Sequence, residues 1–278
     1  MLAGLDIELA NVSDPGRKRP HNEDSAITDT DLGLALVADG MGGYKAGEVA
    51  SAIAAKVVFD GIREGRNKHH FVRGKEWTDP ESVEAALIRT TIESANRYIF
   101  ETAHKVPQCQ GMGTTIVAAL FTAGRVTIAH VGDSRIYRLR DGDLKQVTSD
   151  HSLIQELIDR GFFTSEEAHA NTPKNLVTRA LGIDDTVQVD VQELETLPTD
   201  IYLLCSDGLN DMVNDEDIRL TLGKYSANLL QAAHELVGLA NAGGGKDSIS
   251  VVLARPGSSQ TAGPGLRSKL KSLWSRDS

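Results

Sequence analysis

Four short acidic motifs contain the residues of this sequence whose types and spacing could do chemistry. They are Asn22-Glu23-Asp24, Asp39-Gly40-Met41-Gly42-Gly43, Ser206-Asp207-Gly208 and Gly245-Lys246-Asp247-Ser248. Apolar, strand-like runs at 34–38, 201–205 and 249–253 adjoin the last three. A strand end holds a carboxylate rigidly, and a neighbouring glycine lets backbone and ligand approach closely. Each motif taken alone is more often a turn than a ligand set, because Asp-Gly pairs are common turn residues.

Taken together, the four motifs predict a cluster of carboxylates. Carboxylates that converge in space repel one another unless cations lie between them. Oxygen ligands without a His or Cys cluster suit magnesium or manganese better than zinc. The combination therefore predicts a hydrolytic site that holds several hard metal ions.

Composition narrows the class of protein. A chain of 278 residues forms one large domain or two small ones, and 40% hydrophobic residues can bury a sizeable core. The net charge of −10 argues against a general nucleic-acid binder. Cys109 and Cys205 do not make a disulfide framework, and Cys205 is expected to be a small buried side chain. There is no signal-peptide pattern and no run long enough to span a bilayer, so a soluble, cytoplasmic protein is predicted.

The periodicity of the sequence predicts strands and helices that alternate in groups. Strands are expected at 33–38, 114–121, 125–131, 134–140, 187–193, 201–205 and 248–253. Helices are expected at 47–64, 81–104 and 227–241, the first with Val49, Ile53 and Val57 on one face. This order predicts an α+β layered sandwich.

Three segments have more than one interpretation. Asp141-Gly142-Asp143 resembles part of a calcium loop, but between two strand runs a hairpin turn is favoured. The polar stretch 64–80 is either a solvated connection between helices or a basic docking loop. Beyond the linker-like residues 256–265, Leu266, Leu270, Leu273 and Trp274 share one helical face. That tail is either a surface-binding helix, for a partner or a membrane, or a frayed terminus.

The order of the motifs resembles a bacterial-type protein phosphatase 2C, a family of metal-dependent serine/threonine phosphatases. The resemblance runs from Ser13-Asp14-Pro15-Gly16 to Val251-Val252-Leu253. Between these ends lie Arg19, the four acidic motifs, Ala46-Gly47-Glu48, Gly111-Met112-Gly113-Thr114-Thr115, Val131-Gly132-Asp133-Ser134-Arg135, Asp150-His151-Ser152 and Thr178-Arg179-Ala180-Leu181-Gly182.

The resemblance implies a fold and a function. The fold is a four-layer α-β-β-α sandwich of two antiparallel sheets flanked by helices. Residues 1–255 would form the catalytic domain, with a flap at about 151–183, and residues 256–278 the linker and basic tail. The function is hydrolysis of phosphoserine and phosphothreonine in proteins by a metal-activated water. Such an enzyme acts in signal transduction and opposes a cognate Ser/Thr kinase.

The resemblance also assigns roles at the site. Two principal manganese or magnesium ions and a third, weaker one are implied. Asp39 bridges the principal pair and Gly40 contributes its carbonyl; Glu23 binds one ion, Asp207 and Asp247 bind the other, and Asp133 helps hold the third. Asp24 orients a water, and Arg19 is the phosphate clamp, because its fork can bind two phosphate oxygens.

One position departs from the family pattern. Where the family often has a histidine that protonates the leaving alcohol, this chain has Tyr44. A phenol with a pKa near 10 is a weaker acid, so either Tyr44 or a water fills the role. His130 and His151 are not at the equivalent place, and His130 is expected to be structural.

Two other functions share these motifs. A non-catalytic regulatory member would bind a partner through the same fold, although an idle acidic cluster costs stability without ions. A hydrolase of small phosphomonoesters would use the same metal ligands. Manganese-dependent release of phosphate from a phosphothreonine peptide separates the three possibilities.

Overall fold

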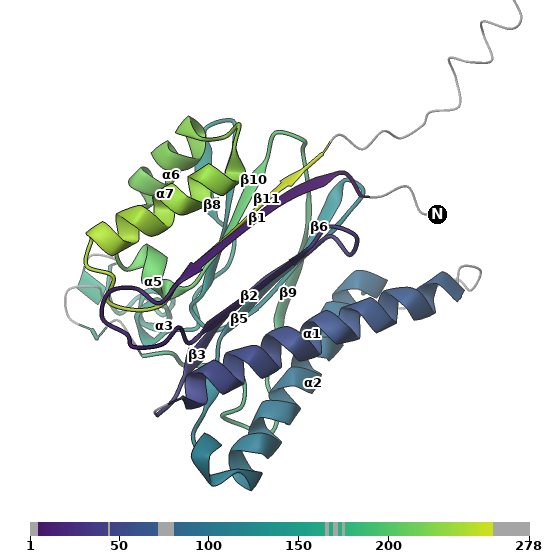
Figure 1. Ribbon diagram of the computed structural model, residues 1–278, viewed down its shortest axis with the longest axis vertical. Coiled ribbons are helices and arrows are strands. Elements are labelled where there is room, and N and C mark those ends of the chain that lie inside the picture. Colours follow the sequence, from purple (N-terminus) through teal and green to yellow (C-terminus); the bar gives the residue numbers. More distant parts are fainter. Residues whose placement is uncertain are drawn as a thin grey trace, which may run out of the picture.

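The structure is a computed structural model that describes residues 5–43, 45–71, 81–164, 167–168, 172–173 and 176–257, with backbone alone for 68–71. Two antiparallel sheets pack face to face, and a layer of helices covers each outer face (Figure 1). The predicted four-layer α-β-β-α sandwich is confirmed.

The strands of the two sheets alternate in blocks along the chain. The first sheet has the order β1 (Ile7–Asp14), β11 (Ile249–Pro256), β10 (Ile201–Cys205), β7 (Arg135–Arg140) and β8 (Asp143–Gln146). The second has the order β2 (Asp24–Asp29), β3 (Leu34–Met41), β5 (Ile116–Thr122), β6 (Arg125–Val131) and β9 (Asp190–Glu195), and β4 (Gly113–Thr114) also pairs with β3. The chain therefore crosses repeatedly between the sheets.

The helices lie in two groups. On the second sheet pack α1 (Ala46–Phe71) and α2 (Val83–Lys105), followed by the 3-10 turn η1 (Pro107–Cys109). On the first sheet pack α5 (Asp207–Asn210), α6 (Asp215–Lys224) and α7 (Leu229–Ala242) (Figure 1). The short α3 (Leu153–Asp159) belongs to the segment between β8 and β9.

Three hydrophobic cores hold the four layers together. On β3, Leu34 and Leu36 pack toward α1 and α2, whereas Ala35 and Val37 pack toward the other sheet. The period of two along a strand produces this division. Because both faces of β3 are buried, its sequence is an unbroken apolar run. The same holds for β10, where Cys205 is fully buried as expected.

The structure corrects several predicted elements. It adds β1, β2, β8 and α6, whose short or polar sequences carry weak periodicity. Helix α1 continues to Phe71, so the first part of the predicted connection at 64–80 is helical. The fully buried residues of α1 include Ala50, Ala54 and Val58, whereas Val49 is 36% exposed.

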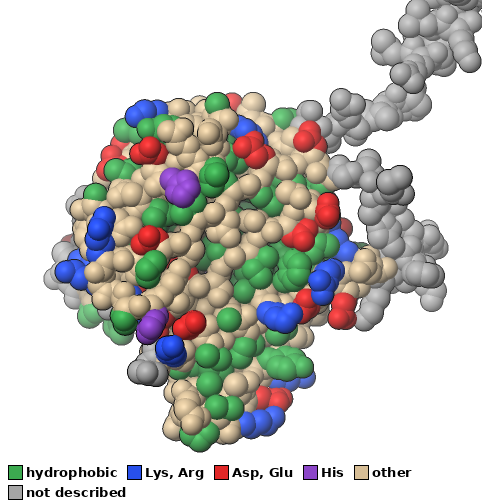
Figure 2. Space-filling view, viewed as in Figure 1, with side chains coloured by type: hydrophobic (Ala, Val, Ile, Leu, Met, Phe, Trp, Pro, Cys, Tyr) green, Lys and Arg blue, Asp and Glu red, His purple; other side chains and the backbone are tan. Residues whose placement is uncertain are grey.

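Other expectations are met or lie outside the described residues. The segment at 141–143 is a hairpin turn that joins β7 to β8, with Arg140 opposite Asp143. No helix in the described part of the chain is long and apolar enough to cross a membrane. Tyr44 and the tail from 258 onward lie outside the described residues. On the face in Figure 2, acidic, basic and hydrophobic side chains are interspersed.

Candidate metal centre

The predicted acidic residues come from strand ends at one end of the sandwich. Asp24 begins β2 and lies opposite Asp39 of β3 in the antiparallel register. Asp133 lies in the turn by which the chain crosses from β6 to β7. Asp207 begins α5 directly after β10, and Asp247 lies two residues before β11. Both sheets therefore contribute carboxylates to the same end.

Serines of the first sheet hold the Glu23-Asp24 pair of the second. The Ser206 hydroxyl donates to Asp24 Oδ2 at 2.7 Å, and the Ser250 N–H donates to the Ser206 oxygen at 2.9 Å. The Glu23 N–H donates to Ser248 Oγ at 3.1 Å. These bonds fix the two sheets relative to each other at the site.

The backbone around Asp39 is fixed as well. The Thr115 N–H and the Thr114 hydroxyl both donate to the Asp39 carbonyl, at 2.9 and 2.8 Å. At the next residue, a Cβ on Gly40 would lie 2.1 Å from the carbonyl oxygen of Gly47, at the start of α1. Only glycine lets the strand and helix backbones meet this closely beside Asp39.

The carboxylates strongly perturb one another. Burial, together with the charges of Asp24 and Asp207, holds the pKa of Asp39 well above its usual range. Burial, then the charges of Asp133 and Asp247, raises the pKa of Asp207 to about 8. This is the repulsion that the sequence predicts for converging acids.

Glu23, Asp24 and Asp133 are also poor sites for an uncompensated charge. Burial raises the pKa of Asp24 to about 6, although hydrogen bonds from Ser206 and Ser250 oppose the rise. Burial, then the charge of Asp150, raises the pKa of Asp133 to about 6. Burial also raises the pKa of Glu23.

This donor set fits hard divalent cations. Every member offers oxygen, and Asp24 Oδ1 is buried without a hydrogen-bond partner in the described part of the chain. An orphaned carboxylate oxygen beside other buried acids is a position for a cation or for the water around it. Magnesium and manganese prefer such ligands.

Arg19, the predicted phosphate clamp, contacts two of the predicted metal ligands. One guanidinium nitrogen is 2.7 Å from Asp247 Oδ2, and another is 3.4 Å from Glu23 Oε2. The hydrogen bond to Asp247 raises the pKa of Arg19. Since the side chain is 45% exposed, these bonds are exchangeable for others.

A polar pocket of about 220 Å³ opens beside Asp207. Its lining includes Asp133, Arg135, Asp150, Asp207 and Asp211. Asp211, which also raises the pKa of Asp207, lies outside the four acidic motifs of the sequence. Its spacing from Asp207 could have indicated this effect, because residues four apart on a helix lie one turn apart on the same face.

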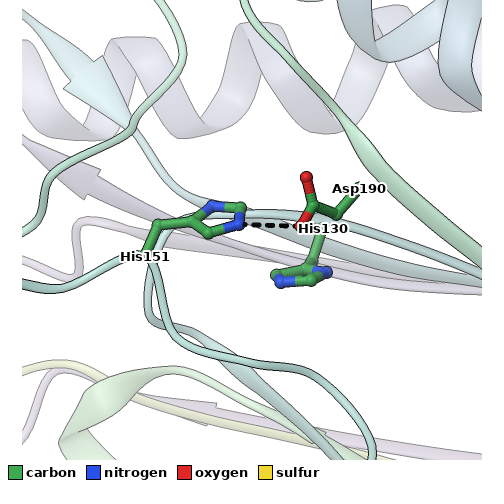
Figure 3. A group of neighbouring side chains, drawn as sticks. All are labelled: His130, His151 and Asp190. Atoms are coloured by element: carbon green, nitrogen blue, oxygen red, sulfur yellow. Dashed lines mark hydrogen bonds and ion pairs between the residues drawn. The ribbon is translucent and has the colours of Figure 1, made fainter. Parts of the chain in front are cut away.

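The histidines form a separate cluster. His130 is buried, and one of its ring nitrogens lies 2.8 Å from the Ser149 carbonyl oxygen. This agrees with the structural role expected for it. His130, His151 and Asp190 offer ligand atoms within 4.8 Å of one another (Figure 3). None of the three belongs to the acidic cluster.

Comparisons with known proteins agree with this architecture. The family model of protein phosphatase 2C matches residues 17–241. Serine/threonine phosphatase Stp of Listeria welshimeri is 38% identical over 244 residues, which cover 87% of this chain and 92% of that protein. Serine/threonine protein phosphatase PstP of Mycobacterium tuberculosis is 40% identical over 252 residues, covering 90% of this chain but only 45% of PstP.

Solved structures show the same relationship. A crystal structure of Mycobacterium tuberculosis PstP superposes with a TM-score of 0.77 at 37% identity, over 90% of this chain and 99% of that one. A PstP catalytic-domain structure that holds two manganese ions gives 0.75 at 36% identity, over 90% and 98%. The chain therefore belongs to the protein phosphatase 2C family, whose members are metal-dependent serine/threonine phosphatases.

The raised pKa of Asp207 predicts how the metal-free protein responds to pH. Its folded-state pKa of about 8 lies above the value of an unfolded aspartate, so the folded state binds the extra proton. Stability from this group is therefore present at low pH and is lost as pH rises toward 8. Between pH 6.5 and 8.5, chelator-treated protein should lose about 1–2 kcal/mol of unfolding free energy through this group.

Denaturant titrations at the two pH values measure this loss. Asp207→Asn should flatten the dependence, whereas Asp31→Asn, an exposed control, should not. Saturating manganese should remove the loss, because cations take the place of protons. Equal stability of the metal-free protein at both pH values would contradict the raised pKa of Asp207.

Proposed function

We propose that this protein hydrolyses phosphoserine and phosphothreonine in proteins, using two manganese or magnesium ions and a third, weaker ion. The observation that carries the proposal is the convergence of carboxylates from both sheets, where burial and the charges of neighbouring acids raise the pKa values of Asp39 and Asp207. Two manganese ions in the related PstP domain support the metal assignment.

The chain offers a ligand for each ion. Asp39 lies centrally, because the charges of four other acids act on it, and it would be shared by the principal pair. Glu23 and the Gly40 carbonyl would complete one side, and Asp207 and Asp247 the other. Asp133, in the adjoining pocket, would help hold the third ion.

The bound ions supply two effects: they acidify a water and screen the phosphoryl oxygens during in-line attack. Asp24 would orient the attacking water through Oδ1, which has no hydrogen-bond partner among the described residues, since Oδ2 accepts from the Ser206 hydroxyl. The Ser206 bond favours one orientation of the Asp24 carboxylate.

Arg19 would change partners when substrate binds. Cations bound by Asp247 and Glu23 would compensate their charge and free the guanidinium. Its planar fork could then bind two phosphate oxygens and set the in-line geometry. In this proposal no side chain of the protein becomes phosphorylated.

The partners follow from the reaction. Phosphorylated proteins are the substrates, and a cognate Ser/Thr kinase supplies the phosphate that this enzyme removes. A cytoplasmic location is consistent with Cys109 and Cys205, which are buried free thiols.

The basic tail at 266–274 would contact a partner or a membrane surface. Tyr44 or a water would protonate the leaving alcohol.

Asp39→Asn and Asp207→Asn test the metal ligands. Each removes a negative ligand while keeping the shape of the side chain, so the fold should persist. The bound ions stabilise the transition state by several kcal/mol, and losing that stabilisation should lower turnover by roughly 100-fold or more. Phosphate release from a phosphothreonine peptide with manganese measures this, and Asp31→Asn is the matched control.

Near wild-type turnover in either variant would remove that aspartate from the mechanism. If the wild type hydrolysed only aryl phosphates and no phosphopeptide, the enzyme would be a small-molecule phosphatase. If it hydrolysed neither substrate, the non-catalytic alternative would stand.

Arg19→Ala tests the clamp. Because its guanidinium lies against Asp247 and Glu23, removing it should leave manganese affinity unchanged or tighter. The Michaelis constant for phosphopeptide should rise about tenfold, from loss of a charge-assisted contact. Calorimetric titration and steady-state kinetics measure the two effects, with Arg17→Ala as the neighbouring control. Weaker metal binding with an unchanged Michaelis constant would make Arg19 a support for the ligands instead.

A further inference from the structure

His151 lies outside the proposed metal site, yet it contacts the turn that carries Asp133. It directly follows Asp150 and precedes Ser152, which bridges to Val177. The side chain is buried and stacks on His130, with ring centroids 4.6 Å apart and an interplanar angle of 18° (Figure 3).

His151 and Gly132 hold each other through two hydrogen bonds. The backbone N–H of His151 donates to the Gly132 carbonyl at 2.9 Å. In return, the Gly132 N–H donates to His151 Nδ1 at 3.0 Å. Gly132 has a φ of +106°, and a Cβ there would lie 2.6 Å from the Thr115 side chain, so the turn has no room to shift toward Thr115. The next residue is Asp133.

The other nitrogen of the His151 ring, Nε2, faces Asp190. Because Nδ1 accepts a hydrogen bond, the neutral ring carries its proton on Nε2, which donates to Asp190 Oδ2 at 3.3 Å. Burial, then the neighbouring His130 ring and the Arg179 guanidinium, lowers the pKa of His151 to about 4, so the ring is neutral at pH 7. Asp190 therefore selects the tautomer that leaves Nδ1 free for Gly132.

Arg179 fixes Asp190 in turn. Its guanidinium donates to Asp190 Oδ1 at 2.7 Å and to the Gln188 carbonyl at 3.2 Å. One residue earlier, the Thr178 N–H donates to the His151 carbonyl at 2.8 Å. The segment 176–183 is thus bonded to His151 through both backbone and side chains.

The same three side chains could be read as a metal site, but their bonds argue against it. His151 Nδ1 is occupied by the Gly132 N–H, and the His130 ring nitrogen nearest Ser149 by a carbonyl. The Arg179 guanidinium lies 3.0 Å from His151 Nε2 and 2.7 Å from Asp190. A cation would have to displace this existing positive charge.

We propose that His151, oriented by Asp190 and Arg179, is a positioning residue that holds the Gly132–Asp133 turn in place for the phosphatase reaction. It couples the segment 176–183 to the candidate ligand of the third ion. The proposal rests on the proposed function, because Asp133 matters through the ion that it helps to hold. Misplacing a ligand by a fraction of an ångström should affect turnover and the weakest ion, and leave the two tight ions alone.

The main test compares His151→Phe with His130→Phe. Both keep an aromatic ring in the stacked pair, but only the first removes the side-chain bonds to the Gly132 N–H and to Asp190. The backbone bond from His151 to the Gly132 carbonyl stays in both variants. We expect His151→Phe to lower kcat on phosphothreonine peptide by about tenfold, as for a modest misplacement. The manganese concentration for half-maximal activity should rise, and KM should change less than twofold. His130→Phe should keep kcat within about twofold of wild type.

A second pair separates the two nitrogens. Asn places its amide near the position of Nδ1, and Gln places it near Nε2. His151→Asn should therefore retain more activity than His151→Gln. This pair decides the question if His151→Phe does not fold.

Two measurements do not depend on turnover. Nitrogen-15 NMR of the magnesium-loaded wild type should show the Nε2–H tautomer for His151. Calorimetric titration with manganese should show the weakest binding step further weakened in His151→Phe, with the tight steps unchanged.

The outcomes are distinguishable. An inactive wild type would overturn the proposed function, whereas NMR and calorimetry would still report on the His151 contact. Wild-type kcat and manganese dependence in folded His151→Phe, an equal loss in His130→Phe, or greater activity of the Gln than of the Asn variant would each overturn the positioning role.

Discussion

The convergence of carboxylates at one end of the sandwich, where burial and mutual repulsion both disfavour their charged forms, is the constraint on which the rest of the site depends. Asp39 and Asp207 have strongly raised pKa values because burial and neighbouring acids disfavour their charged forms. A sandwich that only needed to fold would not gather these groups at one end. The Ser206 bond to Asp24 and the Thr115 bond to the Asp39 backbone hold them there nonetheless. Protons, the Arg19 guanidinium or divalent cations must therefore compensate the negative charge of these carboxylates.

The double-sheet architecture makes this arrangement possible. Asp24 and Asp39 belong to one sheet, and Asp207 and Asp247 flank strands of the other. Because the inter-sheet core fixes the sheets face to face, carboxylates far apart in sequence meet at a rigid site. The turn that carries Asp133 crosses between the sheets, which explains why it has its own support from His151. The ends of rigid strands hold the ligands of the two principal ions, and a turn supported by His151 holds Asp133.

The sequence predicts the fully buried strands well, for a physical reason. Strands such as β3 and β10 are apolar on both faces, so their runs are unmistakable. Strand β1 has a half-buried, polar sequence and was missed. The layer order came from the family resemblance, since periodicity does not say which strands pair. The contact of Arg19 with Asp247 spans 228 positions, and the bond of Gly132 to His151 joins a backbone group to a ring nitrogen. Residue types alone predict neither of these two contacts. The domain boundary at 255 stays a prediction.

The most direct test of the proposed metal site is a crystal structure of the protein soaked with manganese, with the ions located by anomalous scattering. We expect two strong peaks that share the Asp39 carboxylate, with Asp207 and Asp247 on one side and Glu23 on the other. Arg19 should have left Asp247, and Asp24 Oδ1 should have gained a water. A single ion, or manganese bound at His130, His151 and Asp190 with the acidic cluster empty, would contradict it.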